Sequence, residues 1–510
     1  MRNRVLSRGL RAFLFLGKWG LLYALLPGAL LAALEWGLRA TQVGQPCGYL
    51  IQKDFDGAAY RLPNKRFFQR FSSLPIDSIA DWDTMEFLAP VQKAPGAYRI
   101  FIFGESAAYG APYAGYGFPR YLEAMLRARF PERNFEFYNT ACPGINSYIV
   151  QAVAHACAAL QPDLFLVYMG NNEGNPPFSP HSVFGRSAIL SKPAVVRAWM
   201  ELSGLRTAQA GVALLHKLHL DPESPALTWT QDPMNLDLIH ARFETNLLDI
   251  CAAGSAAGAS VVVCTLGRNI AGFQKEEGIA AASAFTGVAI NRLIREAAGR
   301  LKDKNVRLAD IENTLRQNSP DGMPGDRFFE DRVHFTFEGN YLAARTMFEQ
   351  IAPLLATAGA PPAAEALTEG QCEERLGLSP AARKRMRAMR RQTDGKAADP
   401  ALQPAETDAE RAEILDGFRR ACSLAKDDCI LHMLFVRALL DADLPQEALR
   451  EAQALQRICP CHRAVHRLLG LALMRSADAD GSRRELLEQL RRYPDDTLSE
   501  VRLKSLPPPP

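Results

Sequence analysis

The chain has 510 residues, of which 48% are hydrophobic and 23% charged, an ordinary balance for a globular protein. Its formal net charge of +3 is close to neutral for this length, so charge gives no indication of a nucleic-acid partner. The length allows one large domain and a smaller one.

The N-terminus joins a basic stretch to an apolar one. Arginine stands at four positions before the apolar segment: Arg2, Arg4, Arg8 and Arg11. The segment Ala12 to Leu34 contains one charge, Lys18, and can span a bilayer if that side chain reaches back toward the arginines. Positive charge before the segment predicts a cytoplasmic N-terminus and an exported remainder.

We therefore expect residues 1–40 to form a cytoplasmic N-terminus followed by a transmembrane signal anchor. A cleaved signal peptide is the alternative, but no small-x-small cleavage site precedes Glu35-Trp36. A buried soluble helix fits poorly with so long an apolar run after a basic stretch. The predicted localisation is a single-pass membrane protein with its main domain on the exported, periplasmic side.

Residues 41–95 are polar and irregular, and we expect a spacer that packs against the main domain. From Tyr98 onward, strand-like and helix-like patterns alternate. The predicted strands are Tyr98–Phe103, Phe135–Tyr138, Leu164–Met169, Ser260–Thr265 and Val306–Ala309. The predicted helices are Tyr121–Phe130, Ile149–Leu160, Leu238–Ala257, Ala281–Leu301 and Asn340–Leu355. This alternation predicts a parallel sheet with helices on both faces. The strand-free stretch 175–235 is an insertion of the kind that shapes a site.

The composition changes after Leu355. Ala356–Ala366 is rich in alanine and proline, which predicts a linker, and Ser379-Pro380 then starts a basic helix. Its cations are Arg383, Lys384, Arg385, Arg387, Arg390 and Arg391. We interpret them as a solvated helix face, with docking to an acidic polysaccharide or an anionic lipid as the alternative. Linker and basic helix together make up residues 359–406.

A period of 34 residues marks the C-terminal region, 407–510. Pro460 recurs as Pro494 and Leu434 as Leu468, and each unit offers two amphipathic helices separated by a short break. The period and the small residues at the helix contacts resemble tetratricopeptide repeats. A purely structural role and the binding of a protein partner are both open for this region.

The cysteines fall into two informative groups. Four lie in apolar contexts, where free cysteine acts as a small hydrophobic residue: Cys142, Cys157, Cys251 and Cys264. Four more cluster near the C-terminus: Cys422, Cys429, Cys459 and Cys461. The second group could form disulfides after export or hold a metal. No paired Cys-x-x-Cys spacing supports a metal, so we favour disulfides.

Residues of types that can take part in catalysis follow the predicted strands. Ser106 follows the first strand, Gly144 the second and Asn172 the third, and Asp331 and His334 stand just before the last helix. Open parallel sheets place their chemistry at the carboxyl ends of the strands. A serine with an imidazole and a carboxylate suits nucleophilic catalysis. Each residue alone also has a structural explanation as a cap, turn or core residue, but their joint order is hard to obtain by chance.

In these residues the sequence resembles the SGNH (GDSL-type) hydrolase superfamily. Gly104-Glu105-Ser106 resembles its first block and Gly170-Asn171-Asn172-Glu173 its third, each with Glu where Asp is commoner. Gly144 stands for the second block, and Asp331 and His334 stand for the last in their usual spacing. The resemblance covers roughly residues 96–355, and we assign the hydrolase domain to residues 96–358. The longer phrases around these blocks are similar to a membrane-anchored branch that often carries tetratricopeptide repeats.

The resemblance implies a fold and a mechanism. The fold is a three-layer α/β sandwich with a five-stranded parallel, flavodoxin-like sheet, an N-terminal transmembrane helix and a C-terminal all-α repeat region. Ser106 would be the nucleophile, His334 the general base and acid, and Asp331 the residue that orients the imidazole. The backbone N–H groups of Ser106 and Gly144 and the Asn172 amide would form the oxyanion hole. This reaction needs no metal and no organic cofactor.

The predicted function is a serine esterase or acylhydrolase that acts on an O-acyl ester of the cell envelope. One alternative is an O-acyltransferase to an envelope polysaccharide, and another is an envelope scaffold that binds a partner through its helical repeats. The expected partners are the ester substrate, the membrane and a protein at the repeats, with no nucleic acid. Among other candidates, His155 is expected to pack or face solvent, His181 could line the pocket and Arg268-Asn269 could touch substrate.

Overall fold

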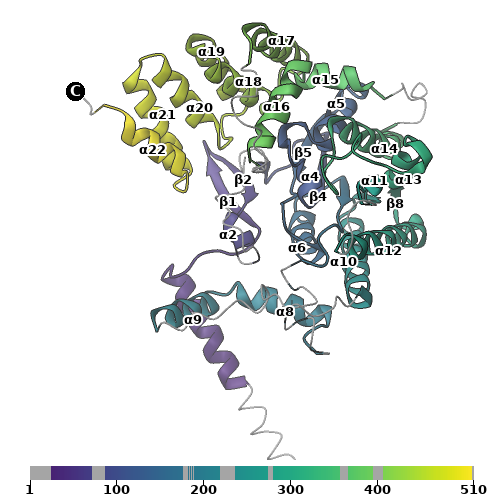
Figure 1. Cartoon of the computed structure of the whole chain (residues 1–510). Coiled ribbons are helices and arrows are strands. Elements are labelled where there is room, and N and C mark those ends of the chain that lie inside the picture. The colour runs from purple at the N-terminus through teal and green to yellow at the C-terminus, as the bar shows by residue number, and fades with distance from the viewer. Residues whose placement is uncertain are drawn as a thin grey trace, which may run out of the picture.

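The computed structural model describes residues 25–69, 71, 87–175, 178, 182, 184, 187, 189–218, 236–273, 279–356, 366–393 and 406–507. Its centre is a five-stranded parallel sheet in the order β5-β4-β6-β7-β8 (Figure 1). The strands are β4 (Ala97–Gly104), β5 (Asn134–Asn139), β6 (Leu164–Tyr168), β7 (Ser260–Cys264) and β8 (Val306–Ala309). Numbered along the chain, this is the 2-1-3-4-5 order of flavodoxin-like sheets. The predicted parallel sheet is confirmed, and each predicted strand agrees with the observed bounds to within one residue.

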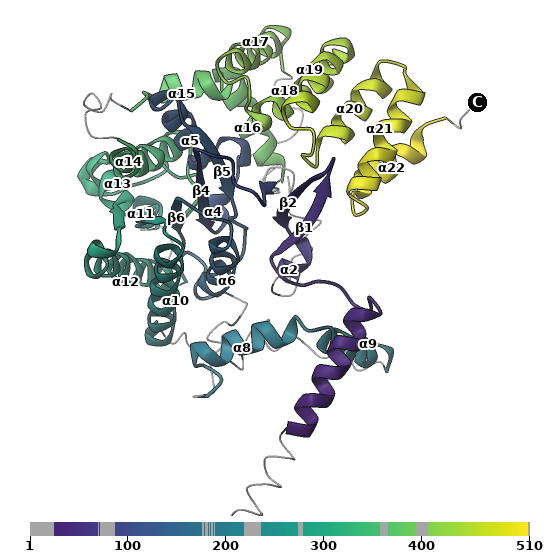
Figure 2. The ribbon, with the colours of Figure 1, turned by 180° about the vertical axis from the view of Figure 1, so that it is seen from behind.

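Helices cover both faces of this sheet, as the alternating pattern predicts. One face carries α5 (Phe118–Arg129), α13 (Ile311–Gln317) and α14 (Phe337–Leu355), and the other carries α6 (Ser147–Ala158), α10 (Leu236–Ala256) and α12 (Ile279–Arg300). Figures 1 and 2 show the sheet between these two layers from opposite sides. β4, an inner strand, reads Ile100-Phe101-Ile102-Phe103, all with at most 1% exposure, because a strand covered on both faces buries consecutive side chains.

Short elements connect the strand ends to the helices. They are α4 (Ser106–Tyr109), α11 (Ile270–Phe273) and the 3₁₀ turns Ala114–Tyr116, Lys302–Lys304 and Pro320–Gly322. In the insertion after β6, α8 (Pro193–Ser203) and α9 (Arg206–Lys217) are helical. The described residues of that insertion contain no strand, in agreement with the sequence pattern.

The residues before β4 form a second, smaller sheet. β1 (Leu50–Phe55) and β2 (Ala58–Pro63) make an antiparallel hairpin, β3 (Ala89–Pro90) pairs with β2, and α2 (Lys65–Gln69) follows the hairpin. Asp56 and Gly57 form the turn with positive φ angles of 51° and 87°. The expectation of an irregular spacer is therefore wrong for these residues. Their apolar side chains pack on the C-terminal helices, since the rings of Phe55 and Tyr493 lie 5.8 Å apart.

At the N-terminal side of this sheet, residues 25–40 form a helix with exposed apolar side chains. Leu30 is 63% exposed and Trp36 74%. The predicted anchor starts at Ala12, so its first half lies outside the described residues. Among the helices that the structure describes, none has both the length and the apolarity to cross a membrane.

The C-terminal region is all-helical. Its helices are α15 (Glu369–Leu376), α16 (Pro380–Thr393), α17 (Asp408–Leu424), α18 (Cys429–Asp441), α19 (Pro445–Ile458), α20 (Val465–Arg475), α21 (Ala479–Arg492) and α22 (Thr497–Ser505). From α17 onward, each helix packs on the next. α19 begins at Pro445 and α21 at Ala479, which is the expected period of 34 residues. The assignment of these helices to tetratricopeptide repeats stays a prediction.

The basic helix α16 is largely neutralised within this region. Arg383 pairs with Glu373 at 2.6 Å, Arg385 pairs with Asp441 at 2.7 Å, and Lys384 pairs with Glu410. The first half of α16 is therefore bound to its neighbours and is not a freely solvated basic face. The side chains of Arg390 and Arg391 lie outside the described residues.

All ten cysteines lie in the described residues, and all are free thiols. The four in apolar contexts are buried, as expected. The expected disulfides among the C-terminal cysteines are absent from this structure.

Candidate active site

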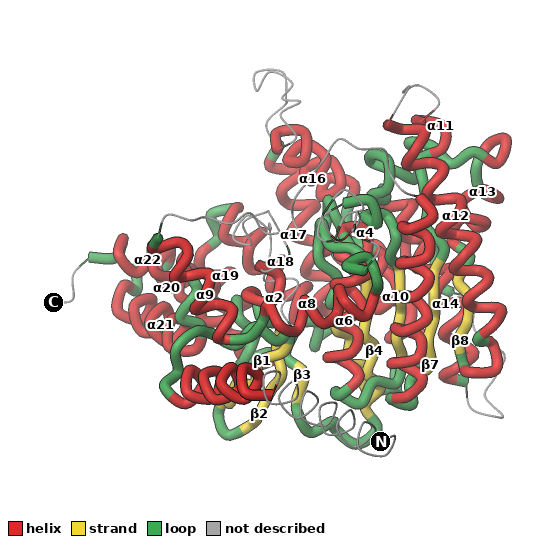
Figure 3. The backbone as a smooth tube through the Cα atoms, turned by 90° about the horizontal axis from the view of Figure 1, so that it is seen from below, coloured by secondary structure: helices red, strands yellow, loops and turns green. Residues whose placement is uncertain are grey.

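The turn after β4 presents Ser106 at the carboxyl edge of the sheet. Gly104 ends the strand in close contact with β6, because a Cβ there would lie 2.1 Å from the carbonyl oxygen of Tyr168. Ser106 then opens α4, which Gly110 ends with a φ of 101°. In Figure 3, α4 and the loops around it lie beyond one end of the parallel strands. The short turn therefore fixes the serine where the loops from several strands meet.

Ser106, His334 and Asp331 form one chain of hydrogen bonds. The Ser106 Oγ lies 2.7 Å from His334 Nε2, and His334 Nδ1 lies 2.7 Å from Asp331 Oδ2. The second oxygen, Asp331 Oδ1, accepts the backbone N–H groups of Val333 at 3.0 Å and His334 at 2.9 Å. Burial acts to raise the pKa of Asp331, but the bonds to His334 and to these N–H groups lower it to about 2. The carboxylate is thus ionised and fixed beside the imidazole.

Asn269 supports the loop that carries Asp331. Its side-chain amide donates to the backbone carbonyl of Asp331 at 3.1 Å and to Asp326 at 2.8 Å. Its backbone N–H donates to the carbonyl of Arg332 at 3.1 Å. Asn269 is only 6% exposed, so a buried side chain holds the loop that carries Asp331 and His334. The sequence pattern placed it at a strand end but gave no sign of this bracing contact.

The predicted oxyanion donors lie on three loops that the structure ties together. The loop after β5 is joined to β4 by a hydrogen bond from the Cys142 N–H to the Gly104 carbonyl at 3.3 Å, and Gly144 follows with a φ of 77°. The side-chain amide of Asn172 donates one hydrogen to the carbonyl of Ile145 at 2.9 Å. An amide carries two hydrogens, so one remains for a ligand. The backbone N–H groups of Ser106 and Gly144 have no acceptor among the described residues.

Two buried glutamates connect these loops. Glu105, the residue before Ser106, accepts the N–H groups of Gly170 at 3.1 Å and Asn171 at 2.9 Å. Glu173 accepts the N–H and the hydroxyl of Ser147 at 2.9 and 2.7 Å. Burial raises the pKa of both carboxyls, and the charge of Glu173 raises that of Glu105 further. Glu105 therefore joins the β4 and β6 loops, and Glu173 joins the β6 loop to α6. The sequence analysis named both glutamates as parts of two motif blocks but did not predict these contacts.

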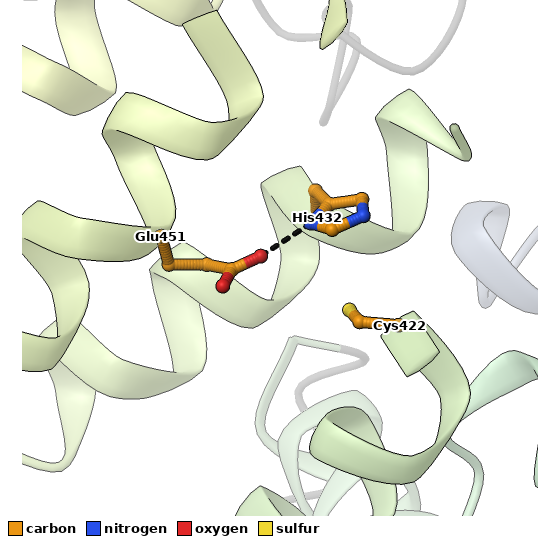
Figure 4. Close-up of side chains that lie close together, drawn as sticks. All are labelled: Cys422, His432 and Glu451. Atoms are coloured by element: carbon orange, nitrogen blue, oxygen red, sulfur yellow. Dashed lines mark hydrogen bonds and ion pairs between the residues drawn. The ribbon is translucent and has the colours of Figure 1, made fainter. Parts of the chain in front are cut away.

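The remaining predicted candidates are not part of this constellation. His155 is half exposed and bonds to Asp249 at 2.9 Å on the surface of α6, as expected for a solvent-facing residue. His181 lies outside the described residues. Within the described residues, the one cluster of three potential metal ligands lies in the helical region, at Cys422, His432 and Glu451 (Figure 4). The residues around Ser106 thus bring together side chains suited to nucleophilic and acid–base chemistry.

No model of a known protein family matches the chain, and no curated protein sequence matches it. Among solved structures, it is similar to Axe2, an acetylxylan esterase from Geobacillus stearothermophilus, with 14% identity and a TM-score of 0.31 over 50% of this chain and 94% of that one. It is also similar to a lipase/acylhydrolase from Enterococcus faecalis, with 16% identity and a TM-score of 0.29 over 50% and 96% of the two chains. A third is LAE5, an alpha/beta hydrolase from the metagenome of Lake Arreo, with 16% identity and a TM-score of 0.31 over 52% and 98%.

Proposed function

We propose that this chain is a serine esterase that hydrolyses an O-acyl ester. The observation that carries the proposal is the hydrogen-bonded chain from Ser106 through His334 to Asp331, with 2.7 Å at both contacts. A serine hydroxyl becomes a good nucleophile when an imidazole in hydrogen-bond contact accepts its proton. The carboxylate holds the imidazole in the tautomer that leaves Nε2 free to act as the base.

The reaction proceeds in two halves. Ser106 Oγ attacks the ester carbonyl while His334 Nε2 takes its proton, and the imidazolium then protonates the departing alcohol. Water attacks the resulting acyl-serine with His334 again as base, which releases the carboxylic acid and regenerates the serine. Asp331 stabilises the imidazolium in both halves because its carboxylate stays ionised. Atoms and protons balance without a metal or an organic cofactor.

The developing negative charge on the carbonyl oxygen is met by hydrogen-bond donors. The N–H groups of Ser106 and Gly144 and the second hydrogen of the Asn172 amide serve this role in the proposal. Support comes from their position on converging loops and from the absence of an acceptor for the two backbone groups within the described residues. Loss of one such donor typically costs about 3–4 kcal/mol of transition-state stabilisation.

We further propose that the substrate is an ester of the cell envelope, such as an acylated sugar. The basic and apolar N-terminus supports this location, since it has the order of an export signal and anchor. An O-acyltransferase would use the same serine but would pass the acyl group to a sugar hydroxyl. Added glycan separates the two reactions, because only a transferase makes an acylated acceptor.

Labelling with a fluorophosphonate probe tests the activated serine. The full-length protein, Ser106→Ala and a matched control, Ser423→Ala on the surface of α17, are treated side by side. We expect the wild type and the control to label and Ser106→Ala not to label, and we expect hydrolysis of short acyl esters to follow the same order. A folded wild-type protein that does not label, or a Ser106→Ala variant that still does, would contradict the proposal.

A further inference from the structure

Three helices of the C-terminal region bring a thiol, an imidazole and a carboxylate together. Cys422 lies near the end of α17, His432 on α18 and Glu451 on α19, and their ligand atoms all lie within 4.8 Å of one another. Figure 4 shows the three side chains converging between the helices. His432 is buried, with 6% exposure, and its Nδ1 is bonded to the Glu451 carboxylate.

The partner of the second ring nitrogen of His432 indicates which nitrogen carries a proton. His432 Nε2 lies 3.2 Å from the backbone carbonyl oxygen of Lys426, which can only accept a hydrogen bond. Nε2 therefore carries a proton, and Nδ1 is left to face a carboxylate. An Nδ1 lone pair against Glu451 would be repulsive, so in this hydrogen-bonded arrangement a proton lies between them, and a metal ion would have to replace it. A backbone carbonyl on the outer nitrogen is also the usual partner of a histidine that binds a metal.

The next repeat supplies a natural comparison. His466 and Glu485 stand 34 residues after His432 and Glu451, and His466 Nδ1 lies 2.7 Å from Glu485. There the outer nitrogen of the ring has no partner among the described residues, so a neutral ring can donate from Nδ1. The position equivalent to Cys422 is Gln456. The helical repeat by itself therefore accounts for a histidine–glutamate pair, but not for the thiol or for the carbonyl on the outer nitrogen.

We propose that Cys422, His432 and Glu451 bind one Zn²⁺ ion. Sulfur, imidazole nitrogen and carboxylate oxygen are zinc ligands, and three protein ligands leave a fourth position for water. Tetrahedral coordination with zinc–ligand distances of about 2.0–2.3 Å places the ligand atoms of one ion roughly 3.3–3.8 Å apart. Since the ligand atoms lie within 4.8 Å of one another, binding requires the side chains to close around the ion by roughly 1 Å. Binding releases the protons held by the Cys422 thiol and His432 Nδ1.

The site would connect the helical region to the catalytic domain. Lys426, whose carbonyl holds His432, belongs to the turn between α17 and α18. Asp428 ends the same turn, and its carboxylate is paired with Arg120 of α5. A zinc ion that holds α17, α18 and α19 together would therefore fix the turn that docks on the sheet domain. This role does not depend on the proposed esterase activity.

Metal titration of the full-length, chelator-treated protein tests the proposal. We expect one Zn²⁺ bound per chain and a rise in the thermal midpoint with Zn²⁺ but not with Mg²⁺. Co²⁺ used as a probe should give the near-ultraviolet charge-transfer band of a thiolate–cobalt bond. Cys422→Ser should abolish that band, and His432→Gln should weaken Zn²⁺ binding by more than the roughly 10–100-fold typical of an outer-shell loss.

His466→Gln is the matched control, because it removes the equivalent histidine of the next repeat. It should bind Zn²⁺ and give the cobalt band as the wild type does. Circular dichroism of each metal-free variant verifies folding, and Cys422→Ser is nearly isosteric. A folded wild type that binds no zinc, or a Cys422→Ser variant that binds it as tightly as the wild type, would overturn the proposal.

Discussion

Asn172 is the residue at which a catalytic role is most easily separated from a purely structural one. Its amide donates one hydrogen to the Ile145 carbonyl and keeps a second one, which the proposal assigns to the oxyanion. We predict that Asn172→Ala lowers kcat by about two to three orders of magnitude, which corresponds to about 3–4 kcal/mol. Turnover of a short acyl ester by the purified variant measures this effect.

Asn175→Ala is the control for that experiment. Its amide contacts Asn172 Oδ1 at 3.4 Å, so its loss leaves the donating side of Asn172 in place. The control should retain kcat within a few-fold of the wild type. Equal and near wild-type rates for both folded variants would remove Asn172 from the oxyanion hole.

The raised pKa values of the two buried glutamates predict how the free energy of unfolding depends on pH. The pKa of Glu105 is raised from 4.5 to about 8 and that of Glu173 from 4.5 to about 7, mainly by burial. Between about pH 5 and about pH 8 the native chain therefore binds more protons than the unfolded chain. The free energy of unfolding must fall as pH rises through this window. Glu173→Gln removes one titrating group and its repulsion of Glu105, so we expect a shallower fall.

Urea unfolding at several pH values in that window measures the slope. Gln can keep the bond from the Ser147 N–H through its oxygen and can donate to the Ser147 hydroxyl, so the loops stay connected. Glu132→Gln, an exposed site in the turn before β5, should leave the slope unchanged. A Glu173→Gln variant with the slope of the wild type would show that these carboxyls do not titrate as stated.

At the scale of elements, β4 and β6 can adopt their register only with a glycine at position 104. A Cβ there would lie 2.1 Å from the Tyr168 carbonyl oxygen and 2.5 Å from the Ala108 Cβ. We predict that Gly104→Ala destabilises the protein by about 1–3 kcal/mol through overpacking. Displacement of Ser106 by about 1 Å would also lower activity by about 100-fold. Denaturant unfolding and ester turnover measure the two effects.

Gly299→Ala is the matched substitution, because no atom lies within 4 Å of a Cβ at this exposed site in α12. There, alanine should stabilise the helix by roughly 0.5–1 kcal/mol. If both alanine variants behaved alike, the close approach of the two strands could not be the reason for Gly104.

The same elements show what a sequence can and cannot predict here. The strands of the main sheet were predictable because each is a short apolar run that a doubly covered sheet must bury. The β1–β2 hairpin was missed although Asp56-Gly57 is a favourable turn dipeptide, because its strands are only partly apolar. The positions of Ser106 at a strand end and of His334 just before the last helix were predictable. The bracing contacts of Glu105 and Asn269 were not, since they join residues more than 60 positions apart.

At the scale of the whole molecule, a buried ionic cluster joins the sheet domain to the helical region. Arg120 of α5 pairs with Glu123 on its own helix and with Asp428 at the start of α18. The side chains of Arg120 and Asp428 are only 7% and 9% exposed. Close packing continues beside this pair, since a Cβ at Gly115 would lie 2.8 Å from the Leu434 side chain. The helical region is therefore fixed to the sheet domain by a buried ion pair and by close apolar packing.

This junction should make the two regions depend on each other for stability. Arg120→Met keeps much of the apolar stem but removes the cation paired with the buried Asp428 carboxylate. Glu123 keeps its pair with Arg127 at 2.9 Å, so the main loss falls on Asp428. Breaking one side of a buried ion pair typically costs about 3–5 kcal/mol, and we expect a loss of that size in urea unfolding. Arg419→Met is the control, since Arg419 pairs with Glu447 at a 44% exposed site and should cost less than about 1 kcal/mol. Similar losses in both variants would mean that the junction is no stronger than a surface contact, and that the helical region is held mainly by its apolar packing.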